Sequence, residues 1–268
     1  MRAVASRGSV GVVLAASALL LSACGGGDTR TEVYKPPKVP DSGAFVFQLR
    51  HANTAQDTPA YQLLAQTGVL GRIVAGMNDT FKLPRDIGVV VTSTDVGPAY
   101  IPEANTLVIG YPFIQSIANT FLQAYPNLTA GQLAERVVNV ASFVLLHEMG
   151  HALVNQLDIP ITAREEDAVD NLATVINVEA FPAGGNVVFD FADFFSLLQA
   201  NPTALSFWDE HSFDLQRAND AVCHLYGSDP QAYANLAGLI PQERRVRCRD
   251  EWNQISSSWE ELLKPYTQ

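Results

Sequence analysis

The chain has 268 residues, of which 47% are hydrophobic and 17% are charged, and its formal net charge is −11. A chain of this length can bury a substantial core, and its composition favours one globular domain with short attachments. The acidic balance argues against nucleic acid as a partner, because nucleic-acid binding needs a basic surface.

The N-terminus predicts a secreted protein with a lipid anchor. Residues 1–23 contain two arginines and then an apolar core, which is typical of a signal peptide, and this core is too short to span a bilayer comfortably. Removing that segment leaves 15 of the 17 basic residues against 28 acidic ones, a net charge of −13. The segment is followed by Cys24 in the sequence LSAC, which resembles the lipobox of bacterial lipoproteins. We therefore expect Cys24 to be lipidated; the alternative is an ordinary signal peptide with a chance cysteine.

Residues 24–43 would form a flexible tether, because they are rich in glycine and proline. Residues 44–268 would form the folded domain. In its first part, period-2 alternation and β-branched runs predict strands at residues 44–49, 87–92 and 105–111. Residues 59–81 have helical spacing, which Gly68 and Gly71 could interrupt.

The remainder of the domain predicts helices. The expected ranges are residues 112–124, 130–156, 164–180, 188–199, 205–226, 231–239 and 241–263, with a loop at 182–186. A small sheet followed by a helical C-terminal part indicates an α+β domain that is predominantly α.

The most informative motif lies near the end of the long helix expected at residues 130–156. It is the pentapeptide His147-Glu148-Met149-Gly150-His151. Histidines four residues apart lie on one face of a helix and can bind one metal ion, and the intervening glutamate can act as a base beside that metal. The flanking residues are apolar, which indicates a buried helix where unpaired polar groups would be costly. A partly exposed helix with ordinary histidines is the alternative.

A catalytic zinc ion usually takes three protein ligands and leaves a fourth position open. A third histidine six residues after the second is excluded, because Leu157 occupies that position. Glu166 and Asp170 lie four residues apart on the next expected helix. They suggest that Glu166 binds the metal and that Asp170 accepts the other ring N–H of a ligand histidine. Glu165 and Asp167 are the alternative ligands, and a solvated acidic first turn is a further alternative.

Two stretches resemble a bacterial family of zinc metallopeptidases that was first described as a domain of unknown function. The first is HEMGHALVNQLDIPITAREEDAVDNLA, residues 147–173; the second is FWDEHSFDLQR with the following CHLYGSDP, within residues 207–230. The resemblance runs from about Phe81 to the C-terminus. It implies a zincin-like fold, in which an edge strand beside the metal helix aligns an extended peptide. Residues 106–111 are our candidate edge, with an internal strand as the alternative.

The resemblance also implies the site. His147, His151 and Glu166 would hold one Zn²⁺ per chain, and Glu148 would be the catalytic base that takes a proton from the attacking water. A further donor should stabilise the oxyanion. His211 is the candidate for this second catalytic role, because acidic neighbours could hold its ring, although a structural histidine is the alternative.

Tyr100 and Tyr111 are rivals to His211 as the oxyanion donor. Lipidation of Cys24 would leave Cys223 and Cys248, which we expect to form a disulfide in an oxidising compartment. Two separate buried thiols are the alternative to that bond.

Together these features predict a membrane-anchored zinc metallopeptidase of the bacterial cell envelope, facing the periplasm or the outside. Its partner would be a peptide or protein substrate, with membrane contact through the lipid anchor only and no nucleic acid. Two alternatives are a non-proteolytic zinc-containing binding lipoprotein and a zinc hydrolase of a non-protein or cell-wall amide.

Overall fold

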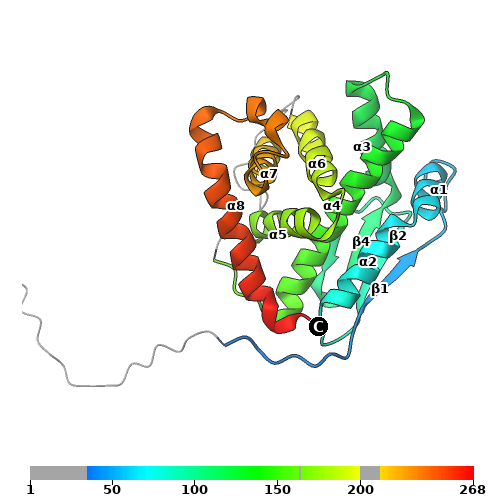
Figure 1. Cartoon of the computed structure of the whole chain (residues 1–268). Coiled ribbons are helices and arrows are strands. Elements are labelled where there is room, and N and C mark those ends of the chain that lie inside the picture. Colours follow the sequence, from blue (N-terminus) through cyan, green and yellow to red (C-terminus); the bar gives the residue numbers. More distant parts are fainter. Residues whose placement is uncertain (1–34, 163, 200–211) are drawn as a thin grey trace, which may run out of the picture. The chain divides into compact units, whose positions relative to one another are not determined.

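A four-stranded sheet is formed by the N-terminal part of the described chain, and helices follow it (Figure 1). The computed structural model describes residues 35–162, 164–199 and 212–268. The elements below belong to one compact unit, Pro36–Gln268. The predicted class, α+β and predominantly α, is confirmed.

The sheet is mixed, with the strand order β1-β2-β4-β3. Its strands are β1 (Phe45–Leu49), β2 (Ile87–Thr92), β3 (Ala99–Ile101) and β4 (Thr106–Gly110). The first, second and fourth strands are parallel, and β3 pairs antiparallel with β4. The prediction that residues 106–111 form an edge is therefore wrong, because β4 lies between β2 and β3. The edge strands are β1 and β3, and the one that contacts α4 is β3, which has three residues and is too short for an alternating pattern to reveal it.

The helical stretch predicted at residues 59–81 is two helices, α1 (Thr58–Thr67) and α2 (Val69–Thr80). Gly68 separates them and has a φ of +57°, a left-handed conformation that glycine adopts without the steric cost of a side chain. Gly71 lies inside α2 and does not interrupt it.

After α3 (Tyr111–Ala124) comes the longest helix, α4 (Ala130–Leu157). Thr129 begins α4 with a capping box, and Asp158 ends it in the left-handed region. Within the described residues, α4 is long and apolar enough to cross a membrane, but 83% of its apolar window is buried in the protein. Its apolar character is therefore that of a core helix.

The helix α4 lies between the sheet and the C-terminal helices (Figure 1). It contacts α2, α3, β3 and β4 on one side and α5 and α6 on the other. The C-terminal elements are α5 (Glu165–Ala180), α6 (Gly184–Gln199), α7 (Asp214–Ser228) and α8 (Gln242–Leu263). Three short 3₁₀ helices are η1 (Pro102–Ala104), η2 (Ala234–Leu239) and η3 (Lys264–Tyr266).

Three helix predictions differ from the structure in this region. The helix predicted at residues 188–199 begins earlier, because α6 starts at Gly184 within the predicted loop 182–186. The range 231–239 contains the 3₁₀ helix η2 rather than an α-helix. Residues 205–211 of another predicted helix lie outside the described residues, and α7 begins at Asp214. The expected disulfide is present: Cys223 and Cys248 join α7 to α8.

Candidate metal centre

The motif on α4 meets the first turn of α5, and Gly150 makes this meeting close. A Cβ atom at position 150 would lie 3.0 Å from the Cβ of Val169 and 3.6 Å from a methyl group of Leu172. Because glycine has no such atom, α5 packs directly on the backbone of α4 between the two motif histidines. This contact helps to place the acidic start of α5 beside them.

Three side chains converge at this point: His147, His151 and Glu166. The two histidine Nε2 atoms are 3.2 Å apart. Glu166 contributes Oε2 at 3.1 Å from His147 Nε2 and Oε1 at 3.3 Å from His151 Nε2. Such a group of nitrogen and carboxylate ligand atoms could hold a metal ion.

The other nitrogen of each histidine ring faces a carboxylate. His147 Nδ1 is 2.7 Å from Asp170 Oδ1, and His151 Nδ1 is 2.8 Å from Glu165 Oε1. A neutral histidine that donates its Nδ1–H keeps a lone pair on Nε2. The two Nε2 lone pairs then converge with a carboxylate, so three acceptors face one another. A cation between them would stabilise this arrangement, and the residues therefore fit a metal ion.

The alternative ligands predicted at the start of α5 lie elsewhere. Glu165 contacts the outer nitrogen of His151, and its side chain is 45% exposed. Asp167 lines a small polar cavity behind α5. Among the three acidic residues of this turn, Glu166 is the one whose oxygens approach both Nε2 atoms.

Protons compete for the same positions in the metal-free protein. Burial alone would lower the pKa of His147, but the carboxylates of Asp170, Glu166 and Glu148 outweigh burial and raise it to about 9. The pKa of His151 is also raised against the effect of burial, mainly by its contact with Glu166. The centre thus favours positive charge, whether a proton or a metal ion supplies it.

Glu148 is buried beside the histidines and is not one of the converging ligands. Burial is the main reason that its pKa is raised, and the histidines and a hydrogen bond from the backbone N–H of Tyr100 oppose this shift. A carboxylate whose pKa is raised accepts a proton more readily than an ordinary one. Glu148 is therefore suited to act as a base.

These groups line a cavity of about 490 Å³. Its wall opposite α4 comes from the edge strand and its flanks, with Ala99, Tyr100 and Pro102 among the lining residues. The cavity gives a substrate access to Glu148 and to the converging ligands.

Behind the centre, Arg217 of α7 makes a two-pronged contact with Asp170. Arg217 Nε donates to Asp170 Oδ2 at 2.6 Å, and Nη2 donates to Oδ1 at 2.9 Å. Burial would raise the pKa of Asp170, but Arg217 and His147 lower it to about 2. Asp170 is therefore an ionised acceptor for the ring of His147.

Three residues are candidates for the oxyanion donor: His211, Tyr111 and Tyr100. His211 lies outside the described residues. Tyr111 is fully buried, and its hydroxyl donates to the backbone oxygen of Arg50, so it is directed away from this cavity. Tyr100 lines the cavity, and its hydroxyl is hydrogen-bonded to Asn155 Oδ1 at 3.0 Å.

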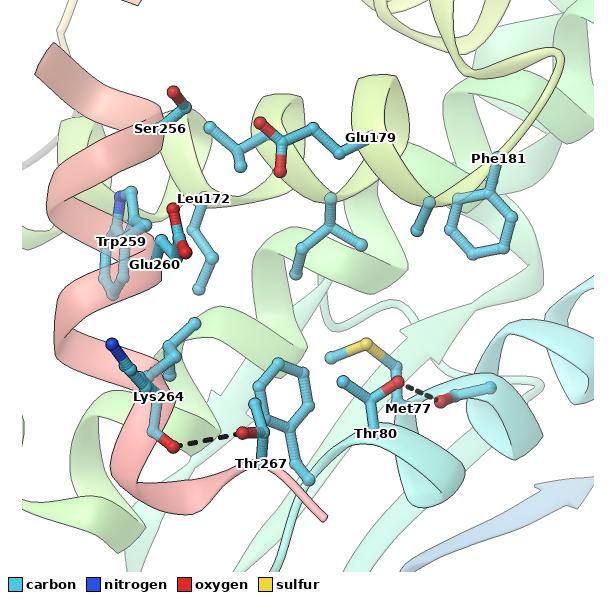
Figure 2. Close-up of a pocket in the computed structure, with 16 residues that line it drawn as sticks. Met77, Thr80, Leu172, Glu179, Phe181, Ser256, Trp259, Glu260, Lys264 and Thr267 are labelled. Atoms are coloured by element: carbon cyan, nitrogen blue, oxygen red, sulfur yellow. Dashed lines mark hydrogen bonds between the residues drawn. The ribbon is translucent and has the colours of Figure 1, made fainter. Parts of the chain in front are cut away.

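A second and larger cavity lies on another side of α5, between α2 and α8 (Figure 2). Its volume is about 580 Å³, and Met77, Leu172 and Trp259 are among its mostly apolar lining residues. The described lining includes no histidine and no cysteine. Its walls offer shape and apolar surface but no converging metal ligands.

Comparison with known proteins identifies the family. A family model described as "Putative metallopeptidase" matches residues 50–263. No curated protein and no solved structure gave a match. The family indicates a hydrolase with a peptidase-like function, a bound metal and a peptide or protein substrate. The match covers most of the chain and confirms the resemblance seen in the sequence. The chain belongs to this metallopeptidase family.

Proposed function

We propose that the protein is a zinc-dependent peptidase, with Zn²⁺ held by His147, His151 and Glu166. The observation that carries this proposal is the convergence of ligand atoms from three side chains. With one ligand atom taken from each side chain, all of them lie within 4.8 Å of one another. The two Nε2 atoms are 3.2 Å apart, close to the separation of about 3.3 Å between two ligands that lie about 2.0–2.1 Å from a tetrahedral zinc ion. Two imidazoles and one carboxylate are also a common protein ligand set for catalytic zinc.

When bound, zinc supplies Lewis-acid chemistry, which polarises a peptide carbonyl and makes water more acidic. Glu148 then has the role of general base. Its buried carboxylate takes a proton from the attacking water and delivers it to the leaving nitrogen of the peptide. The Tyr100 N–H holds this carboxylate toward the cavity.

The two histidines are oriented by different carboxylates. Asp170 holds His147 from a buried position, and Glu165 holds His151 from a more exposed one. Each carboxylate accepts the Nδ1–H and so leaves Nε2 available for the metal. These two contacts therefore orient both rings toward the proposed metal position.

An extended peptide is the substrate that the surroundings of the cavity favour. The cavity is bordered by β3, an edge strand, and edge strands can align an extended peptide by main-chain hydrogen bonds. This arrangement supports a zincin-like mode of binding, with β3 in the aligning role that the sequence suggested for residues 106–111.

We also propose that the protein acts in the bacterial cell envelope, anchored by lipid on Cys24. The support from the sequence is the signal-like segment 1–23, which lies outside the described residues. The support from the structure is the disulfide between Cys223 and Cys248, because such bonds persist in oxidising compartments.

The test is to measure zinc content and peptide-library cleavage for the purified protein and its Glu148→Gln variant. We expect one zinc per chain in both, and a loss of cleavage on the order of a hundredfold or more in the variant. Glu135→Gln is the matched control, since Glu135 lies exposed on the same helix; it should keep zinc and cleavage. Full cleavage by Glu148→Gln, or a protein that binds no metal, would refute the proposal.

A further inference from the structure

The contact between Arg217 and Asp170 is the tightest link between α7 and the metal centre. Both guanidinium prongs reach the carboxylate, and the side chain of Arg217 is only 9% exposed. The same Oδ1 atom of Asp170 that accepts from Arg217 Nη2 also faces His147 Nδ1. The three residues therefore form one chain of contacts from α7 to a proposed zinc ligand.

Aromatic rings hold the guanidinium in this orientation. The Arg217 Cζ atom lies 4.2 Å from the ring centre of Phe195 and 5.4 Å from that of Phe191. Phe191 also stacks on Phe143 at 3.6 Å, and Phe143 precedes His147 by one helical turn on α4. A guanidinium against aromatic faces loses rotational freedom, which pre-organises its bond to a carboxylate.

We propose that Arg217 is a positioning residue for the zinc ligand His147, acting through Asp170. This inference rests on the proposed zinc site and goes beyond it by assigning a residue that touches neither metal nor substrate. The two-pronged contact fixes the plane of the Asp170 carboxylate, and that plane sets the direction in which His147 presents Nε2. Without the two-pronged contact, the Asp170 carboxylate could rotate, and the His147 ring would lose its fixed orientation.

A related arrangement lies away from the metal centre, where the two prongs of Arg136 contact two aspartates, Asp190 and Asp193. Arg136 on α4 donates to Asp190 at 2.8 Å and lies 4.0 Å from the ring centre of Phe121. Asp190 also accepts a bond from Asn139 of α4 at 2.7 Å, as Asp170 is bonded to His147. Both arginines are partly buried and join their own helix to an aspartate on another, but none of these Arg136 partners is a proposed zinc ligand.

The experiment measures Zn²⁺ affinity by chelator competition in the wild-type protein and in Arg217→Met and Arg136→Met. We expect Arg217→Met to weaken zinc binding about tenfold or more, as loss of a contact behind a metal ligand does, and Arg136→Met to change it less than about twofold. The visible spectrum of the Co²⁺-loaded protein should change in Arg217→Met alone. Equal zinc affinities in the two variants would overturn the inference and leave Arg217 as a structural tie.

A second pair of variants tests whether the effect passes through Asp170. In an Asp170→Asn background, Arg217→Met should cause less than about a twofold further loss of zinc affinity, because the contact is already broken. A full additional loss would contradict the proposed route. If Arg217→Met does not fold, Arg217→Lys replaces it, since lysine keeps the charge but cannot make the two-pronged contact. We then expect zinc affinity to fall about threefold. In the Asp170→Asn background, Arg217→Lys should cause no further loss of zinc affinity.

These outcomes separate this inference from the proposed function. A wild-type protein that binds no zinc contradicts the proposed function. A wild-type protein that binds zinc and cleaves peptides, with Arg217→Met behaving like Arg136→Met, contradicts only the role of Arg217.

Discussion

Two of the cavities that border α5, the apolar one and the one at the metal centre, differ in what their walls can do. The first half of α5 presents Glu165, Glu166 and Asp170 toward the histidines of α4. From Leu172 onward, the helix presents apolar side chains toward α2 and α8 (Figure 2). One helix thus separates a polar cavity with paired charges from a larger apolar one.

The size of a cavity is therefore a poor guide to its chemistry in this protein. The larger cavity has an apolar surface and holds none of the proposed ligands. At the smaller one, the histidines of α4 pair with carboxylates of α5, and Arg217 of α7 pairs with Asp170 behind them. Buried charges are costly unless they are paired or bind a metal, so their convergence marks the functional region.

The largest expected effects separate the two cavities, because a substitution at one should change zinc affinity and a substitution at the other should change stability. His147→Ala should weaken zinc binding on the order of a thousandfold or more, because it removes one of three ligands. Trp259→Ala should lower the free energy of unfolding by about 3 kcal/mol, because it empties buried apolar volume, and should leave zinc affinity within about twofold. Chelator competition and denaturant unfolding measure both quantities. Loss of zinc affinity in Trp259→Ala would show that the cavities are not independent.

A pH series tests the polar cavity alone, through the protonation of His147. In the metal-free protein the pKa of His147 is raised from 6.5 to about 9. Its contribution to stability is therefore fully present below pH 6.5 and is lost as the pH rises toward 9. Zinc must displace the same proton, so zinc affinity should increase by up to about tenfold per pH unit in that interval.

Thermal unfolding in chelator and zinc competition between pH 6.5 and 8.5 measure these opposite trends. His147→Ala should remove the fall in metal-free stability over this range. A flat zinc affinity across the range would contradict the raised pKa.

The smallest effect should distinguish the two carboxylates that orient the histidines. The Asp170 side chain is 12% exposed and that of Glu165 is 45% exposed. Solvent screens the exposed pair, so Glu165→Gln should weaken zinc binding only about threefold, whereas Asp170→Asn should weaken it about tenfold to a hundredfold. Isothermal titration of both variants checks the order, and an equal loss would contradict the asymmetry.

Much of the fold could be predicted from the sequence, because the periodic patterns are long. The α4 helix and three of the four strands follow from apolar periodicity, and the interruption at Gly68 follows from glycine chemistry. The edge strand β3 could not be predicted, since three residues carry no period. The order of the strands in the sheet could not be predicted either, because strand pairing depends on contacts between residues that are distant in sequence.

The converging side chains of the centre, and Asp170 behind them, could be predicted from helical spacing together with the family resemblance, because residues four apart lie on one face. The supporting roles of Glu165 and Arg217 could not be predicted. The contact of Glu165 with His151 depends on the angle between α4 and α5, and the contact of Arg217 with Asp170 depends on how α7 packs on α5. Gly150 was part of the motif, but its close approach to Val169 becomes visible only when both helices are placed.

We propose that His147, His151 and Glu166 hold a zinc ion with one position left open. X-ray absorption spectroscopy of the zinc-loaded protein is the sharpest test of this ligand set. We expect two histidine nitrogens at about 2.0–2.1 Å, one carboxylate oxygen at about 2.0–2.2 Å and one further oxygen that is not from the protein. A sulfur ligand, a fourth protein ligand or a protein that takes up no zinc would contradict it.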